Sequence, residues 1–221
     1  GDQIATSDRA EMRREGDLFL LIRDARVVTP EYVIHADSIA RYDAIDEGEA
    51  WGHVILVEPD ASSVVTGGHA TFDRLGGRMT VDRGPRLESR DQGSEPLLAT
   101  AVTMDFLRDL DRIVMVDSVT IRQGRTLALA DTAQVFGKER MLLTGGPPEA
   151  DDGEGGTFRA ASMEYWYEDG EVRRMDLKGD AMVEDSEPAE LADRYRGLPE
   201  SNTLTGASIT LDREDGSPSR P

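Results

Sequence analysis

The sequence lacks cysteine, has few aromatic residues and carries little positive charge. Without cysteine it can form no disulfide, thiolate nucleophile or cysteine-ligated metal site. Aromatic residues make up 5% and hydrophobic residues 38% of the 221 residues, which is little for one thick core but enough for a thin two-layered one. The net charge of −19 repels nucleic acid, so no nucleic-acid partner is expected.

Long hydrophobic runs are also missing. No stretch approaches the roughly 18–20 consecutive apolar residues that a membrane-spanning helix needs. The chain opens with Gly1-Asp2-Gln3-Ile4, without the basic and apolar regions of a signal peptide. Either the protein is cytosolic or a signal has been removed, and the lack of an initiator methionine favours a removed signal.

An internal repeat is the main positive signal. Similar segments recur at intervals of about 30 residues, and the interval lengthens only before the last segment. The anchor residues, which mark the same place in each segment, are Asp8, Asp37, Gly67, Ala101, Asp131, Ala161 and Ala207. An aromatic residue follows five positions after several anchors, as Tyr42, Phe72, Phe106, Phe136 and Trp166.

Each repeat has the pattern of two β-strands joined by a short turn. Apolar and polar residues alternate, or β-branched and aromatic residues dominate, and both patterns favour strands over helices. Asp169-Gly170 and Gly76-Gly77 are typical tight turns. The sequence therefore predicts an all-β fold in which each repeat adds one strand to each of two sheets.

One segment departs from the repeat. Glu187 to Gly197 contains helix-forming residues, with Pro188 near its start and glycine at its end, which predicts a short helical insertion at about 186–198. The repeat continues through the other loops, so residues 1–221 are predicted to form a single domain. The last repeat lacks its second strand, and a truncated last repeat is expected.

The repeats resemble those of the OstA/LptA-like lipopolysaccharide-transport family. The resemblance lies in Ile34-His35-Ala36-Asp37-Ser38-Ile39-Ala40-Arg41-Tyr42, in Leu177-Lys178-Gly179-Asp180-Ala181-Met182-Val183, and in Leu143-Thr144-Gly145-Gly146-Pro147. It extends from about Ile4 to Asp212, and the evidence is the series of motifs at constant spacing rather than any one motif. The helical insertion and the strong acidity depart from the family pattern.

The resemblance implies a fold, a location and a function. It implies an open antiparallel β-jelly roll of two facing sheets, in a periplasmic protein that is not an enzyme. Such a protein shields the acyl chains of lipopolysaccharide between its sheets on the way to the outer membrane. It joins other OstA/LptA-like transport proteins, or further copies of itself, through edge strands.

Apolar residues in the phase of the anchors are the candidates for the lipid-binding groove. They are Ile34, Ala36, Ile39, Val54, Leu56, Leu98, Ile121, Phe158, Met163 and Val183. The same residues fit the core of a closed sandwich, which leaves open an acidic structural or adhesive β-repeat module without a ligand. A parallel β-helix acting on polysaccharides is a further alternative.

The sequence offers no recognisable catalytic or metal-binding motif. His35, His53 and His69 lack the spacing of a metal site, and no Gly-x-Ser-x-Gly motif surrounds a serine. We therefore predict no catalytic residue, no metal and no cofactor.

Overall fold

The computed structural model describes residues 4–13, 17–30, 32–58, 62–73, 75–90, 95–186 and 201–212, almost all of them in strands. The strands are β1 (Ile4–Thr6), β2 (Arg9–Arg13), β3 (Leu18–Val28), β4 (Val33–Tyr42), β5 (Glu47–Val57), β6 (Ser63–Asp73), β7 (Arg78–Asp82), β8 (Arg86–Ser89), β9 (Leu97–Thr100), β10 (Thr103–Leu107), β11 (Arg112–Gln123), β12 (Thr126–Phe136), β13 (Arg140–Thr144), β14 (Glu149–Asp151), β15 (Gly156–Arg159), β16 (Ser162–Glu168), β17 (Glu171–Ser186) and β18 (Ser201–Asp212). A 3-10 turn, η2 (Arg108–Leu110), precedes β11. The prediction of an all-β fold is confirmed.

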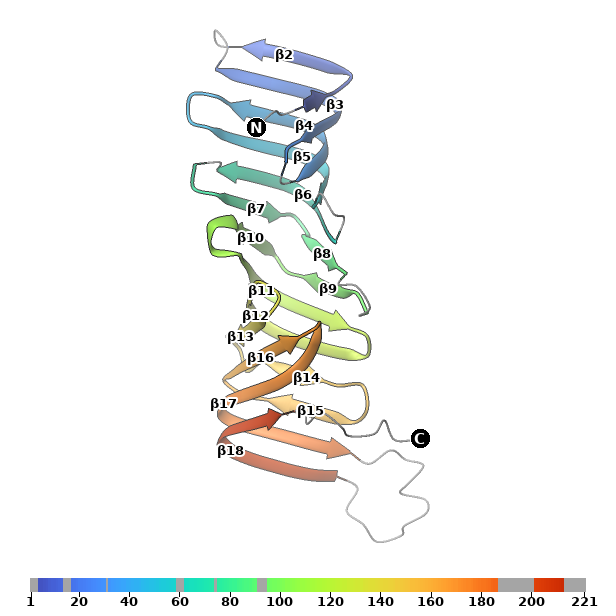
Figure 1. Cartoon of the computed structure of the whole chain (residues 1–221), viewed down its shortest axis with the longest axis vertical. Helices are drawn as coiled ribbons and strands as arrows, with labels where there is room; N and C mark the ends of the chain where they lie inside the picture. The colour runs from blue at the N-terminus through green and yellow to red at the C-terminus, as the bar shows by residue number, and fades with distance from the viewer. Residues whose placement is uncertain are drawn as a thin grey trace.

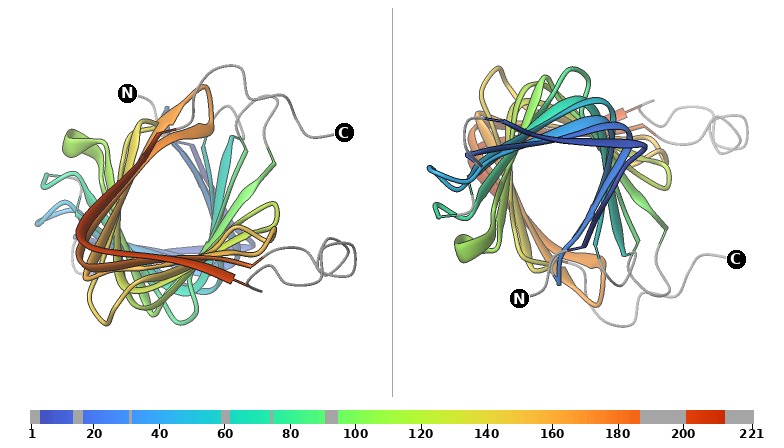
Figure 2. Two further views of the ribbon diagram at one scale, coloured as in Figure 1. Left: turned by 90° about the horizontal axis from the view of Figure 1, so that it is seen from below. Right: turned by 90° about the horizontal axis from the view of Figure 1, so that it is seen from above.

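The strands form one continuous 18-stranded antiparallel sheet that is folded along its length. Layer A contains β2, β7, β10, β13 and β16, and layer B contains β1, β8, β9, β14 and β15. The remaining strands are long and run through both layers, as β6 does when its two halves pair with β7 and β8. The strands stack into a column with β1 and β2 near one end and β18 at the other (Figure 1), and Figure 2 looks along this column.

The two layers meet at a corner that the eight long strands cross, whereas the ten shorter strands begin or end beside it. The pairing register shifts at the middle of the long strands, for example between Val116 and Val119 of β11 and between Lys178 and Ala181 of β17. A repeat therefore adds two strand segments to each layer. The expectation of one strand per layer is wrong, because the long strands bend at the corner and contribute a segment to both layers.

Pairs of residues with left-handed backbone conformations make the corner. They are Arg23-Asp24, Gly52-His53, Arg83-Gly84, Asp117-Ser118, Gly145-Gly146 and Gly179-Asp180, all with positive φ. Two such residues opposite one on the neighbouring strand form a β-bulge, which bends the strand and increases its twist. Recurring at about 30-residue intervals, these bulges are the physical basis of the sequence repeat.

The strand facing each pair supplies a single corner residue. Its main-chain N–H donates to the carbonyl oxygen of the first left-handed residue, as from Asp8 to Arg23 (3.1 Å) and from Ala161 to Gly179 (2.7 Å). The anchors Asp8, Asp131 and Ala161 occupy this position. In two repeats the donors are Gly68 and Val102, one residue after the predicted anchors Gly67 and Ala101.

The helical insertion predicted at about 186–198 falls outside the described residues, except for Ser186, which ends β17.

Candidate functional site: an apolar trough between the layers

Apolar side chains line the inner faces of both layers in continuous rows. The deep row of layer A lies next to the corner, and its members are directly paired from strand to strand and buried. It consists of Leu21, Ile39, Ala50, Ala70, Val81, Met104, Met115, Ala133, Leu143, Met163, Leu177 and Ile209. This row joins the two layers into one core along the column.

A second row of layer A lies closer to its hairpin turns and carries larger side chains. This mouth row consists of Phe19, Arg41, Gly48, Phe72, Met79, Phe106, Ile113, Val135, Met141, Tyr165, Met175 and Leu211. Phe19, Met79, Phe106, Ile113 and Val135 are only partly buried. The inner face is therefore more accessible at these five residues than in the deep row, whereas Phe72, Met141, Tyr165 and Met175 of the mouth row are buried.

Layer B presents its own apolar row opposite. This facing row consists of Val27, Ile34, Leu56, Val65, Leu87, Ala99, Ile121, Ala128, Ala150, Phe158, Val183 and Leu204. The two layers together thus form a trough with apolar walls that runs along the column.

The trough opens into a groove of about 530 Å³ near the middle of the chain. Leu56, Val65 and Leu87 of the facing row line one wall, and Phe72, Met79, Phe106 and Ile113 line the other. Ligand pockets usually have volumes of roughly 300–1,000 Å³ and mainly apolar walls, so this groove has the size and chemistry of a binding site for an apolar group.

Polar residues surround the mouth of this groove. The layer B rim carries Thr29, Pro30, Tyr32, Glu58 and Ser63, and the layer A rim carries Asp46, Asp73, Gly77, Arg78, Arg108, Asp111 and Arg112. An amphiphile could therefore place its chain between the layers while its polar group stays at the rims in water.

Farther along the trough, tyrosine side chains fill the space between the layers. Tyr165 is buried, and its hydroxyl donates to Sδ of Met163 at 3.7 Å. Burial raises the pKa of Tyr165 and of Tyr167 well above the usual range, so both phenols stay neutral at physiological pH. These residues have the character of packing rather than of acid–base catalysis.

The structure places nine of the ten candidate groove residues on the inner faces. Ile34, Leu56, Ile121, Phe158 and Val183 belong to the facing row, Ile39 and Met163 to the deep row, and Ala36 and Val54 lie buried beside the corner. Leu98 does not join them. It pairs with Glu88 and Arg122, whereas its neighbour Ala99 is the inward residue of β9.

The prediction that Leu98 faces the groove is wrong, because the corner of its repeat lies one residue later in the sequence than predicted. The donor at this corner is Val102 rather than the predicted anchor Ala101. Because strand side chains alternate, an error of one residue reverses the face.

Sequence reasoning missed the main groove residues Phe72, Met79, Phe106 and Ile113. The signal was present in the aromatic residues that follow the anchors. Phe72 and Phe106 lie on the inner face, whereas Phe136 and Trp166 lie on the outer face, because the first two belong to the repeats with shifted corners. Correct placement of the corner would have separated the two groups.

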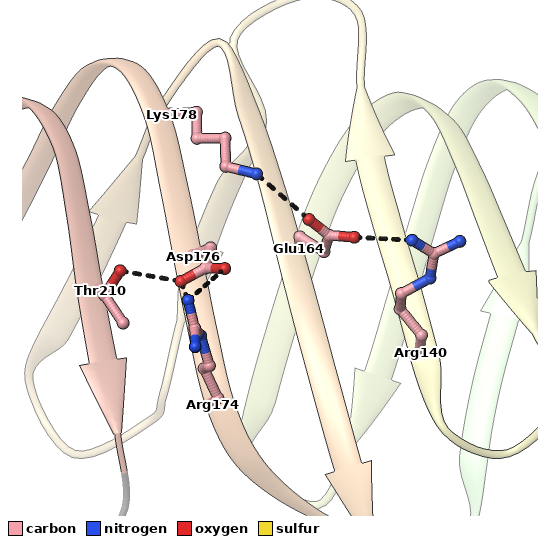
Figure 3. A network of polar contacts seen from close by, with 6 residues as sticks. All are labelled: Arg140, Glu164, Arg174, Asp176, Lys178 and Thr210. Carbon is pink, nitrogen blue, oxygen red and sulfur yellow. Dashed lines mark hydrogen bonds and ion pairs between the residues drawn. The ribbon is translucent and has the colours of Figure 1, made fainter.

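The outer face of layer A is polar where the inner face is apolar. Arg140 and Lys178 contact Glu164 at 2.9 and 3.3 Å, and Asp176 accepts hydrogen bonds from Arg174 and Thr210 (Figure 3). Such cross-strand pairs stabilise a sheet and have a structural role.

Within the described ranges no group of three or more His, Asp or Glu side chains could hold a metal ion. His53 contacts Asp37 at 2.9 Å, and His69 lies between Asp82 at 3.1 Å and Glu49 at 3.9 Å. Among the described residues there is also no helix with the length and apolar character to cross a membrane.

No protein-family model and no curated protein matches the sequence. Among solved structures, the chain is matched to LptH, the LptA-homologous periplasmic component of the lipopolysaccharide transport device of Pseudomonas aeruginosa, with 9% sequence identity and a TM-score of 0.25 over 92% of this chain and 94% of that chain.

Proposed function

We propose that this chain is a periplasmic lipid carrier, not an enzyme, that shields the acyl chains of lipopolysaccharide between its two layers on the way to the outer membrane. The observation that supports this most is the groove of about 530 Å³, which lies between apolar residues of the facing row and of the mouth row and opens at a polar rim. Each methylene group transferred from water into such a groove gains about 0.8 kcal/mol. A transport protein needs this combination, since it must cover a chain without enclosing the polar headgroup.

The repeat motifs support the identity of the lipid. The segments around Asp37, Gly145 and Gly179, which resemble OstA/LptA-like repeats, supply corner positions of the trough. The motif residues therefore shape the trough itself rather than an unrelated surface.

The proposed partners would bind at the edge strands of the column. Met12 of β2 and Leu204 of β18 lie on the inner phase of strands at opposite ends of the column, and they are 70% and 55% exposed. Strand addition by another OstA/LptA-like protein, or by a second copy of this chain, would cover both residues and continue the trough.

Site-specific photo-crosslinking tests the carrier function. A photoreactive residue at Phe106, inside the groove, should capture lipopolysaccharide, whereas one at Lys178, on the outer face, should not. Equal capture at both positions, or none at Phe106, would favour the alternative of an acidic structural module without a ligand.

A further inference from the structure

A ladder of arginine and aromatic side chains runs along the outer face of layer A beside its hairpin turns. Each member of this rim ladder is directly paired with the next across neighbouring strands. The rim ladder consists of Arg78, Leu107, Arg112, Phe136, Arg140, Trp166 and Arg174. In a chain with a net charge of −19, it concentrates cationic groups along one rim.

Aromatic rings contact two of these guanidinium groups, those of Arg112 and Arg140. The Arg140 Cζ lies 3.9 Å from the ring centroid of Phe136 and 5.5 Å from that of Trp166, and the Arg112 Cζ lies 5.8 Å from Phe136. A cation–π contact orients a guanidinium plane without neutralising it, so an arginine held in this way can still bind an anion through its N–H groups unless a carboxylate already occupies them, as Glu164 does for Arg140.

Arg112 differs from the other arginines of the ladder. Arg78 is bound to Asp105, Arg140 to Glu164 and Arg174 to Asp176. Across the described part of the chain, Arg112 has no carboxylate partner, and its buried Nε has no hydrogen-bond partner. Leaving a buried donor unsatisfied is costly, and an anionic ligand would remove that cost.

The position of Arg112 connects the ladder to the groove. Arg112 and Arg78 line the mouth of the groove, next to the apolar Phe106 and Ile113. Carboxylates, including Asp73 and Asp111, line the same mouth. The electrostatic repulsion from distant acidic residues is screened beyond about 8 Å at physiological salt, so a local guanidinium group can still bind an anion.

We infer that Arg112 of the rim ladder binds the anionic headgroup, a phosphate in the first instance, of the amphiphile whose acyl chain occupies the groove. This inference rests on the proposed carrier function, because the chain must enter the groove to place its headgroup at Arg112. Arginine suits the task since its planar N–H edge matches phosphate oxygens in a bidentate arrangement.

Two amphiphiles with the same chain separate the headgroup from the groove. Calorimetry would measure the binding of dodecyl phosphate and dodecyl maltoside, each below its micellar concentration, to the wild type and to Arg112→Gln. Arg122→Gln is the matched control, because Arg122 lies on the same strand but in layer B, is exposed, and does not line the groove. Arg112→Gln should weaken dodecyl phosphate binding about tenfold, as expected for a lost charge-assisted hydrogen bond, and leave dodecyl maltoside unchanged. Arg122→Gln should change neither.

The outcomes distinguish this inference from the function on which it rests. If both variants weaken dodecyl phosphate equally, overall charge rather than Arg112 is responsible, and the inference fails. It also fails if Arg112→Gln has no effect while the wild type binds both amphiphiles, although the groove would stand. Displacement of dodecyl phosphate by inorganic phosphate at equal concentration would overturn the assignment to a lipid headgroup. A wild type that binds neither amphiphile would overturn the carrier function and the inference together.

Discussion

Glu164 of β16 and Asp176 of β17 are directly paired on the outer face of layer A, so two carboxylates lie side by side within the sheet (Figure 3). Like charges in this arrangement destabilise a sheet unless cations offset them. Here Arg140 and Lys178 contact Glu164, and Arg174 binds Asp176 through Nε and Nη2 at 2.9 and 3.0 Å. The hydrogen bonds from Arg174 lower the pKa of Asp176 below its usual value.

This lowered pKa predicts a pH-dependent loss of stability. The folded-state pKa of Asp176 is below the unfolded value of about 3.9, so its contribution is fully present above that pH and is lost as the pH falls through the folded-state pKa. Asp176→Asn should lower the free energy of unfolding at pH 7 by about 1 kcal/mol, since Arg174 is partly solvated. The difference from the wild type should shrink as the pH falls below 4.

Thermal unfolding followed by circular dichroism at pH 7 and pH 3 would measure this difference. Asp180→Asn is the control, because Asp180 is exposed on the same strand and asparagine tolerates its left-handed backbone. A constant difference between Asp176→Asn and the wild type at both pH values would show that the ion pair is not responsible.

The close approach of strands at the corner predicts that two corner glycines differ in their tolerance of alanine. Gly179 has φ +77°, and a Cβ there would lie 2.7 Å from the Cβ of Ala161 across the corner. Gly84 has nearly the same φ, +79°, but a Cβ there would meet no atom within 4 Å. Gly84→Ala should therefore cost only the backbone strain, about 1 kcal/mol, whereas Gly179→Ala should cost at least about 2 kcal/mol. Urea unfolding measures both values, and equal losses would mean that the strands at this corner do not approach as closely as described.

The strand content and the repeat could be predicted from the sequence, because alternation and turn residues act locally. The full set of corners could not. Gly145-Gly146 and Gly179-Asp180 contain glycine and were recognised as recurring motifs, but Arg23-Asp24 and Asp117-Ser118 adopt the same left-handed conformation with ordinary side chains. Nothing in their residue types identifies them, since the pairing of neighbouring strands imposes the bulge.

Predicting which face of a strand a side chain occupies required the correct position of the corner in each repeat. The candidates Ile34 and Leu56 were placed correctly, because the corner residue Asp37 of their repeat was located correctly. Leu98 was placed on the wrong face because its corner is displaced by one residue. The position of the groove also depends on the separation between the layers, and no pattern within one strand reports that distance.

The difference between a trough and a closed core can be measured by substitution. Phe106 is partly buried at the groove mouth, whereas Met115 is fully buried in the deep row. Phe106→Asp should retain a cooperative thermal transition, because the carboxylate can reach water, but should abolish binding of a fluorescent acyl probe. Met115→Asp should unfold the protein, since an unpaired charge would be buried at the corner. Unfolding by Phe106→Asp as well would indicate a closed core at the mouth row.

Proline substitutions along the β18 edge test the proposed end-to-end assembly. Among the described strands, β18 pairs only with β17, so its other side presents main-chain groups that no described strand pairs with. In an antiparallel sheet, consecutive residues direct their N–H groups to opposite sides. Of Thr203→Pro and Leu204→Pro, one should therefore remove a hydrogen bond to β17 and lower the melting temperature. The other should remove a donor from the free edge and weaken association while leaving the melting temperature nearly unchanged.

Sedimentation velocity over a range of concentrations, combined with thermal unfolding, would separate the two effects. The wild type should show concentration-dependent growth, because a strand added to β18 would cover Leu204 and extend the apolar trough of one protomer into the next. The edge-facing variant should sediment as a monomer with the stability of the wild type. A wild type that stays monomeric up to about millimolar concentration, or an edge-facing variant that associates as the wild type does, would exclude β18 as the joint, since unpaired edge groups are what the association requires.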